Sequence, residues 1–140
     1  MPAAAHFADD VVAALRGAFA ATAPREFVGL LGGRRAGVAW QVEAFAPVPN
    51  RAATTNALAV APADFAAAEA TLRAAGHDWL GFAHGHPHAP ATPSARDRAA
   101  FWPECLQAIV GGELERAELR VFWRDAAGCR ELACVAAEAP

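Results

Sequence analysis

Apolar residues follow two different periods along this 140-residue chain, and this pattern restricts its fold more than any other feature. Phe7, Val11, Leu15 and Phe19 recur at every fourth position, which predicts an amphipathic helix over residues 7–20. Residues 26–46 instead carry runs rich in branched and aromatic side chains, EFVGLLGG and GVAWQVEAF, separated by a glycine-containing turn. They predict two strands joined as a hairpin, so the chain belongs to the mixed α/β class.

The remaining segments continue this alternation of helices and strands. Pro62 suits a first helical position and Gly76 a helix end, whereas the prolines at 87, 90 and 93 predict an irregular loop. We therefore expect a short strand at 57–60, a helix at 62–75, a strand at 78–84, a helix at 94–101, and strands near 105–110, 117–124 and 129–136. Without a repeat or a linker, residues 1–140 are expected to form a single domain.

Composition excludes several classes of function. The formal net charge is −3, and positive charge occurs only in short pairs such as Arg34–Arg35, so we expect no nucleic-acid partner. No apolar run approaches the roughly 20 residues of a membrane span, and the N-terminus lacks the pattern of a secretory signal. An odd number of cysteines without a CxxC pair favours reduced thiols and a cytoplasmic protein.

The segment HGHPHAPATPSARD, residues 84–97, holds a dense group of side chains that can bind metal. On an extended backbone His84 and His86 point to the same side, so their imidazoles can share one ion. Asp97, in the first turn of the expected helix, is the candidate third ligand. Three protein ligands leave the fourth tetrahedral position to water, which is typical of a catalytic zinc site.

Each of these residues also has a simpler interpretation. A His-x-His pair often lies on the surface, and Ser94-x-x-Asp97 is an ordinary capping arrangement at a helix start. His88 is either a further ligand or an exposed side chain, and the change of direction expected at Pro87 favours exposure. Ser94 is the only serine of the chain, and its hydroxyl can donate to the oxyanion that forms during hydrolysis.

Taken together, residues 84–97 match the pattern H-x-H-x7-S-x-x-D, which resembles the JAMM motif of the MPN-type zinc metallopeptidases. Residues 24–33, PREFVGLLGG, are similar to the P-x-E-x-x-G-L-L-x-G segment of that family. The resemblance implies a zinc ion bound by His84, His86 and Asp97. It also implies that Glu26 is the general acid and base and that Ser94 stabilises the oxyanion.

The resemblance further implies a cytidine-deaminase-like, three-layer arrangement in which a central mixed β-sheet is flanked by helices. One position departs from the family pattern, because Gly85 stands where serine is usual. This departure threatens no ligand, but it removes a hydrogen bond near the ligands or reshapes the cleft. A true deaminase would need H-x-E together with P-C-x-x-C, and Pro103-Glu104-Cys105 lacks the second cysteine.

The function implied by the resemblance is hydrolysis of a peptide or isopeptide bond. The resemblance to small bacterial members of the family implies that the substrate is the C-terminus of a ubiquitin-like sulfur-carrier protein. Such a substrate is an extended, glycine-rich tail that could pair with a sheet edge beside the zinc. A homodimer is compatible with this function. Two alternatives stay open: a non-catalytic MPN-type scaffold, and a metal-binding or metal-sensing module in which Glu26 and Ser94 have no task.

Overall fold

The computed structural model describes residues 1–136, which form seven strands, three α-helices and one short 3-10 helix. In chain order these are β1 (Ala4–Phe7), α1 (Asp9–Thr22), β2 (Val28–Arg34), β3 (Ala39–Val48), α2 (Pro62–Ala74), β4 (Asp78–Pro87), α3 (Ala95–Ala100), β5 (Leu106–Gly112), η1 (Leu114–Arg116), β6 (Glu118–Asp125) and β7 (Gly128–Ala136). The expected mixed α/β class is confirmed.

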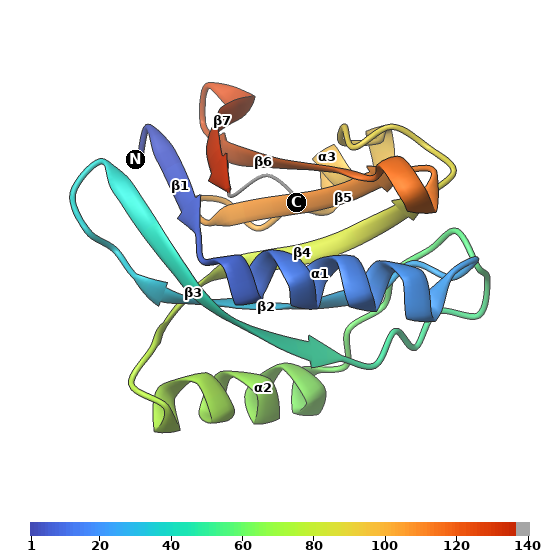
Figure 1. Ribbon diagram of the computed structural model, residues 1–140, viewed down its shortest axis with the longest axis horizontal. Helices are drawn as coiled ribbons and strands as arrows, with labels where there is room; N and C mark the ends of the chain where they lie inside the picture. The colour runs from blue at the N-terminus through green and yellow to red at the C-terminus, as the bar shows by residue number, and fades with distance from the viewer. Residues whose placement is uncertain (137–140) are drawn as a thin grey trace.

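The strands form one mixed sheet that closes on itself in the order β1-β3-β2-β4-β5-β6-β7. Most neighbours are antiparallel, but β4 and β5 are parallel, and β1 runs parallel to both β3 and β7. We expected a central sheet flanked by helices in three layers. Helices do lie on both faces, but the structure departs from a layered arrangement because β1 joins the two ends of the sheet and closes it (Figure 1). A four-residue strand has too few alternations to give a period in sequence, so this closure was not predicted.

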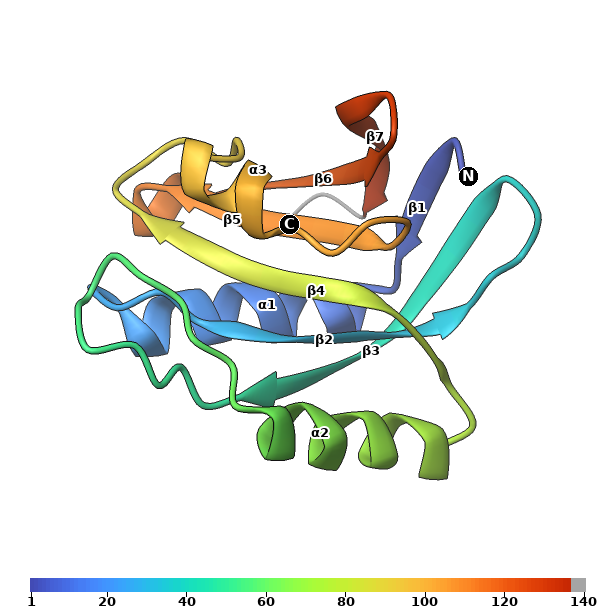
Figure 2. The same ribbon diagram turned by 180° about the vertical axis from the view of Figure 1, so that it is seen from behind.

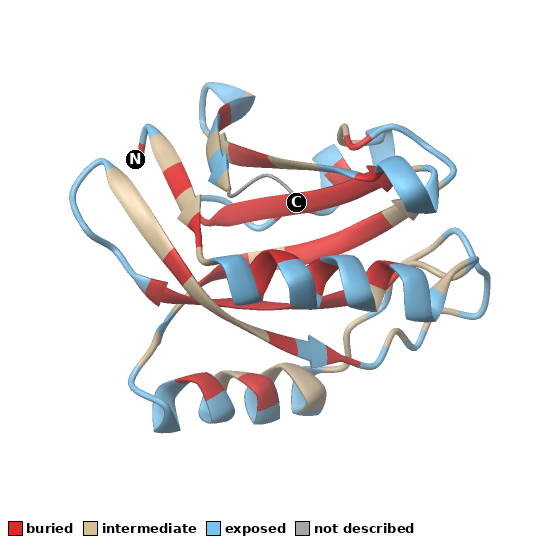
Figure 3. Ribbon diagram, viewed as in Figure 1, coloured by how far each residue is buried: buried red, intermediate tan, exposed pale blue. Residues whose placement is uncertain are grey.

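Helix α1 covers the inner face of the curved sheet. Its residues Val11, Leu15 and Phe19 are buried, which confirms the four-residue period, although Phe7 lies in β1 and the helix begins at Asp9. They belong to one apolar cluster that also takes side chains from all seven strands. The buried residues therefore run continuously through the strands beside α1 (Figure 3).

Two other helices lie on the opposite face of the sheet, as the view from behind shows (Figure 2). Ala68 and Leu72 of α2 pack against Leu30 and its neighbours on β2 and β3. Phe101, directly after α3, packs against Ile109 of β5. Helices α2 and α3 cover separate parts of this face. The end of β4 lies between the two helices, next to the loops that follow and precede them.

Some local predictions are corrected by the structure. Strand β4 continues through Pro87, because its parallel pairing with β5 extends as far as Gly112. Residues 57–60 form no strand. Their polar backbone atoms are instead bound by the loop that precedes them. The Asn50 side chain donates to the carbonyl of Ala57 and accepts from the N–H of Ala59, and the N–H of Arg51 donates to the carbonyl of Ala59.

Two predicted elements are confirmed. Helix α2 begins at Pro62 as predicted, and the β2–β3 hairpin is present, with its turn at Gly37 and a β-bulge at Gly33. The three cysteines are free. Among residues 1–136, none of the helices combines the length and apolar character that a membrane span requires.

Candidate metal centre

His84 and His86 lie near the end of β4, on the face of the sheet opposite α1. Strand pairing holds this end from both sides: His84 is opposite Val28 of β2 and opposite Ile109 of β5. The residue between them, Gly85, belongs to the other face of the strand. The shared direction of the two imidazoles that was predicted from the sequence is therefore present.

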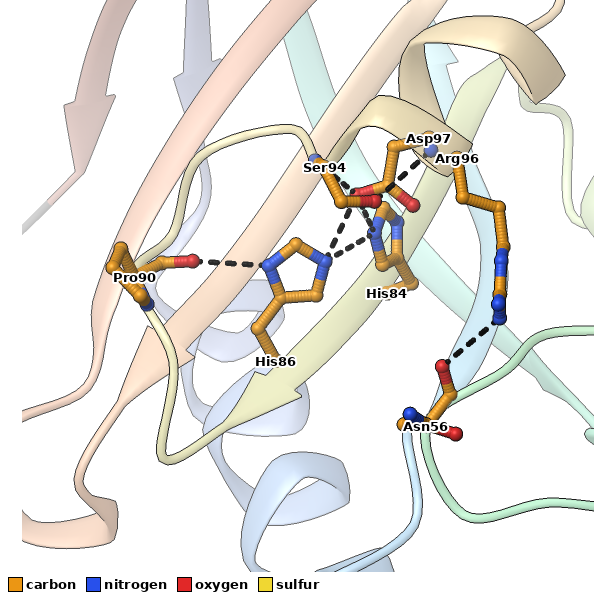
Figure 4. A network of polar contacts seen from close by, with 7 residues as sticks. All are labelled: Asn56, His84, His86, Pro90, Ser94, Arg96 and Asp97. Carbon is orange, nitrogen blue, oxygen red and sulfur yellow. Dashed lines mark hydrogen bonds and ion pairs between the residues drawn. The ribbon is translucent and has the colours of Figure 1, made fainter.

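Asp97 brings a carboxylate from the first turn of α3 to these imidazoles (Figure 4). Its Oδ2 atom lies 3.3 Å from Nε2 of His84 and 3.0 Å from Nε2 of His86, and the two Nε2 atoms are 3.1 Å apart. His84 and Asp97 are both buried, with relative exposures of 3% and 8%. Three groups that can ligate a metal thus meet at one point with little access to solvent.

Ser94 and Asp97 form a reciprocal capping box at the start of α3. The backbone N–H of Asp97 donates to Oγ of Ser94, and the N–H of Ser94 donates to Oδ2 of Asp97, both at 3.0 Å. The capping interpretation of this pair is confirmed. The cap also fixes the direction of the Asp97 carboxylate, so the same interaction that starts the helix orients one member of the cluster.

The proline-containing loop after β4 orients His86. Its Nδ1 atom lies 3.0 Å from the carbonyl oxygen of Pro90, which can only accept a hydrogen bond. In the neutral imidazole that a metal would require, the proton therefore resides on Nδ1 and the lone pair of Nε2 would face the ion; without a metal, a proton on Nε2 donates to Asp97. Histidine ligands in metal sites are commonly held in this way by a carbonyl on the far ring nitrogen.

Glu26 approaches the histidines from the segment that leads into β2. A carboxylate oxygen of Glu26 and ring nitrogens of His84 and His86 all lie within 4.8 Å of one another. The pairing of β2 with β4 extends beyond the strand, because the N–H of Gly85 donates to the carbonyl of Phe27 at 3.1 Å. Glu26 was expected on the first strand of the hairpin, and it lies two residues before that strand, beside the cluster.

Burial and charge shift the acidities of these groups. Burial raises the pKa of Glu26 above its ordinary value, and the nearby His84 and His86 oppose that shift. Burial would also raise the pKa of Asp97, but hydrogen bonds from His84, His86 and the Ser94 backbone outweigh it and hold that pKa well below the ordinary range. Asp97 is therefore an anion, as a metal ligand must be.

Asn50 is a positioning residue that the sequence did not single out, because an asparagine directly after a proline is an ordinary loop residue. Its side-chain amide donates to the carbonyl of Glu26 at 3.0 Å and to that of Ala57 at 2.8 Å. Arg25 adds a hydrogen bond to the carbonyl of Ala52 at 2.7 Å. These contacts fasten residues 50–59 to the segment that carries Glu26.

His88 takes no part in the cluster. It is exposed, and its Nδ1 atom lies 2.8 Å from a carboxylate oxygen of Glu113. The exposed interpretation of this histidine is confirmed. Its position follows from a left-handed backbone conformation, with φ of 62°, directly after Pro87.

The three central residues fit a tetrahedral zinc ion. Zinc–nitrogen and zinc–oxygen bonds of about 2.0–2.1 Å place neighbouring ligand atoms about 3.3 Å apart in a tetrahedron. The observed separations between Nε2 of His84, Nε2 of His86 and Oδ2 of Asp97 lie between 3.0 and 3.3 Å. Two imidazoles and a carboxylate are also a donor set that zinc accepts readily.

Comparison with solved structures supports the fold. Protein DSY2949 from Desulfitobacterium hafniense is 28% identical with a TM-score of 0.86, over 96% of this chain and 94% of that one. A protein from Salinibacter ruber is 26% identical with a TM-score of 0.69, over the same shares of the two chains. AF2198, a JAB1/MPN domain protein from Archaeoglobus fulgidus, is 18% identical with a TM-score of 0.55, over 96% and 99%, and it shows the fold alone.

No curated protein matches the chain. Residues 8–125, however, match the family described as prokaryotic homologs of the JAB domain. This stretch includes Glu26 and all members of the histidine–aspartate cluster. The chain therefore belongs to the family of prokaryotic JAB-domain homologs.

Proposed function

We propose that this protein is a zinc-dependent metallopeptidase or isopeptidase of the JAMM type. The observation that carries the proposal is the convergence of two imidazoles and one carboxylate, with separations of 3.0–3.3 Å, beside the carboxylate of Glu26. A site that only binds metal would need no further carboxylate next to its ligands. Glu26 gives this site a group that can accept and release a proton.

In this mechanism His84, His86 and Asp97 hold the metal, and each remaining residue has one task. Zinc, when bound, supplies a Lewis acid and lowers the pKa of water to about 7. Glu26 accepts the proton of the attacking water and passes it to the leaving amine. The Ser94 hydroxyl donates to the developing oxyanion; in the capping box Oγ is only an acceptor, so its hydrogen is available.

The substrate we propose is the C-terminal tail of a ubiquitin-like sulfur-carrier protein. The strands that carry the site offer no free edge to such a tail, because β2 and β4 are each paired on both sides. The tail would instead lie against the loop of residues 50–61 and helix α3, which border the cluster. The three free cysteines suit a reducing compartment, and we place this reaction in the cytoplasm.

Metal analysis combined with a cleavage assay tests the proposal. We expect one zinc per purified chain, measured by mass spectrometry of the metal content. We expect loss of the tail from a carrier protein with a C-terminal extension, seen in its intact mass, inhibited by a chelator and restored by zinc. Zinc-loaded protein that cleaves neither carrier tails nor peptides would show that the proposal is wrong.

The Glu26→Gln variant separates catalysis from metal binding. The amide keeps the shape of the side chain but cannot take up a proton, so zinc content should equal that of the unchanged protein. Turnover should fall by about 10²–10⁴, the usual contribution of a general acid or base. A zinc-loaded Glu26→Gln protein with full turnover would remove Glu26 from the mechanism.

A further inference from the structure

An apolar cavity of about 400 Å³ lies directly beside the metal centre, and His84 and Asp97 form part of its wall. We propose that this cavity binds a large apolar side chain of the substrate peptide, next to the bond that is cleaved. The inference rests on the proposed function and adds to it a preference for leucine- or phenylalanine-sized residues. Its volume lies within the range of about 300–1,000 Å³ of ordinary ligand pockets.

The chemistry of the wall supports an apolar occupant. Away from the metal centre the cavity is bordered mainly by aromatic and aliphatic side chains, including Leu58, Val60, Phe65, Phe82, Phe101 and Trp102. Gln107 is the remaining polar residue of the wall, and its amide group donates to the sulfur of Cys105 at 3.3 Å. A charged or strongly polar side chain would therefore lose its hydration in this cavity without gaining an obvious partner.

Trp102 gives the cavity an exposed aromatic rim. Half of its surface is accessible, at 51%, although a large aromatic side chain is usually buried. Its ring is nevertheless held in place, with centroids 5.4 Å from those of both Phe65 and Phe82. A fixed, exposed indole next to a metal centre is a surface on which an apolar side chain can pack at little cost in conformational entropy.

A second cavity, of about 490 Å³, lies on the other side of the cluster and differs in character. Its wall includes Glu26, Ser94 and the exposed Arg96. Asp97 belongs to the walls of both cavities, so the metal centre borders one space lined mainly by apolar residues and one lined by more polar and charged residues. A peptide bond at the metal would thus have an apolar subsite on one flank only, while the small residues of a glycine-rich tail could occupy the other flank.

A cleavage-site survey tests this preference. Zinc-loaded protein is incubated with a complex mixture of synthetic peptides, and the products are identified by mass spectrometry. We expect leucine, methionine or phenylalanine at one fixed position near the cleaved bond, with turnover at least about 10-fold above glycine there. Cleavage without enrichment of large apolar residues at any position would overturn the inference while leaving the proposed function intact.

Two valine variants show whether the cavity is responsible. Val60 lines the cavity, so Val60→Phe should fill it and shift the preference toward glycine and alanine. Val38 is 69% exposed in the β2–β3 turn and borders none of the cavities described here, so Val38→Phe introduces the same change as a matched control. An unchanged preference in a folded Val60→Phe protein, checked by its melting temperature, would also contradict the inference.

A binding measurement keeps the inference testable if no peptide is cleaved. Zinc-loaded Glu26→Gln protein is titrated with Ac-Ala-Phe-Ala-NH2 and Ac-Ala-Gly-Ala-NH2, and the indole N–H signal of Trp102 is followed by NMR. Trp102→Phe identifies that signal. We expect the phenylalanine peptide to shift it with a Kd at least about 10-fold lower than the glycine peptide. Equal Kd values would exclude the apolar subsite, whereas selective binding without hydrolysis by the unchanged protein would keep it and reject the proposed activity.

Discussion

One oxygen of Asp97 takes part in three contacts: with Nε2 of His84, with Nε2 of His86 and with the backbone N–H of Ser94. It supplies the only negative charge among the three proposed ligands. Without that charge the two imidazoles alone bind zinc less tightly, because a stable protein site needs at least three ligands in good geometry.

We therefore expect Asp97→Ala to lose its zinc. After dialysis against metal-free buffer, the zinc content should fall from one ion per chain to below about a tenth. His88→Ala is the control, because His88 is an exposed neighbour outside the cluster, and its zinc content should not change. Full zinc occupancy in Asp97→Ala would mean that another group completes the site.

The packing on the other face of β4 explains why glycine, and not serine, stands at position 85. A Cβ atom at this position would lie 2.7 Å from Cδ1 of Phe27 and 2.9 Å from Cδ1 of Phe19. The space for a serine side chain is thus filled by two aromatic rings on the side of α1. The departure from the family pattern therefore affects the core, whereas from the sequence we expected either a lost hydrogen bond near the ligands or a reshaped cleft.

Gly85→Ser should accordingly destabilise the protein. Overpacking of a well-filled core costs about 1–3 kcal/mol, which a urea titration would detect as a lower midpoint. Zinc content should remain at one per chain, because the new side chain points away from the ligands. Adding Phe27→Leu should recover part of the loss, and an undiminished midpoint in Gly85→Ser would show that the rings move aside freely.

At the scale of elements, Ser94 has two proposed tasks at the start of α3, capping the helix and stabilising the oxyanion, and these tasks can be separated. Ser94→Ala removes the capping oxygen and should lower the free energy of unfolding by about 1 kcal/mol, whereas Ser94→Gly costs only a few tenths of a kcal/mol. Both variants lack the hydroxyl, so both should lose about 10²–10³ in kcat if that group stabilises the oxyanion.

Thermal unfolding and kcat of the two variants, measured side by side at equal zinc content, show whether Ser94 stabilises the oxyanion or only caps the helix. If the loss of kcat follows the loss of stability, Ser94 acts only through the helix cap.

The elements also show what the sequence can reveal. Helices α1 and α2 were predictable, because a four-residue apolar period and an initial proline are local signals. The convergence of His84, His86 and Asp97 was predictable, because the motif places all three within 14 residues of chain. Strand β1 was not predictable, because Ala5 and Phe7 are recognisable as strand residues only from their pairing with residues about 35 and 130 positions away. Residues 57–60 look like a strand, but the Asn50 amide and the backbone of Arg51 bind them in place of a neighbouring strand, which the sequence does not show.

At the scale of the whole molecule, β1 turns an open sheet into a closed one. Phe7 is 5% exposed and is opposite Val42 of β3 and Ala136 of β7. Trp40 of β3 and Trp123 of β6 meet edge to face, with ring centroids 5.4 Å apart, and join the same interior. The stability of distant strands should therefore depend on this short segment.

We expect Phe7→Ala to lower the free energy of unfolding by about 3–5 kcal/mol, as for other buried aromatic residues. Near-ultraviolet circular dichroism, to which the tryptophan pair contributes together with the other ordered aromatic side chains, should be lost at the same denaturant concentration as the backbone signal. Val38→Ala, at an exposed position, should stay within about 0.5 kcal/mol of the unchanged protein. A loss of the tryptophan signal well before the backbone signal would mean that β1 closes the sheet without stabilising the rest.

Strand β4 has a practical consequence for redesigning this protein. Its even-numbered residues Phe82, His84 and His86 border the cavity and the ligand cluster, while Ala83 and Gly85 between them are buried on the other face. Alternate residues of this one strand thus serve binding preference and folding. A combinatorial library that varies Phe82 and the facing Val60 could change which peptides are accepted, while the odd-numbered positions that sustain the scaffold stay fixed.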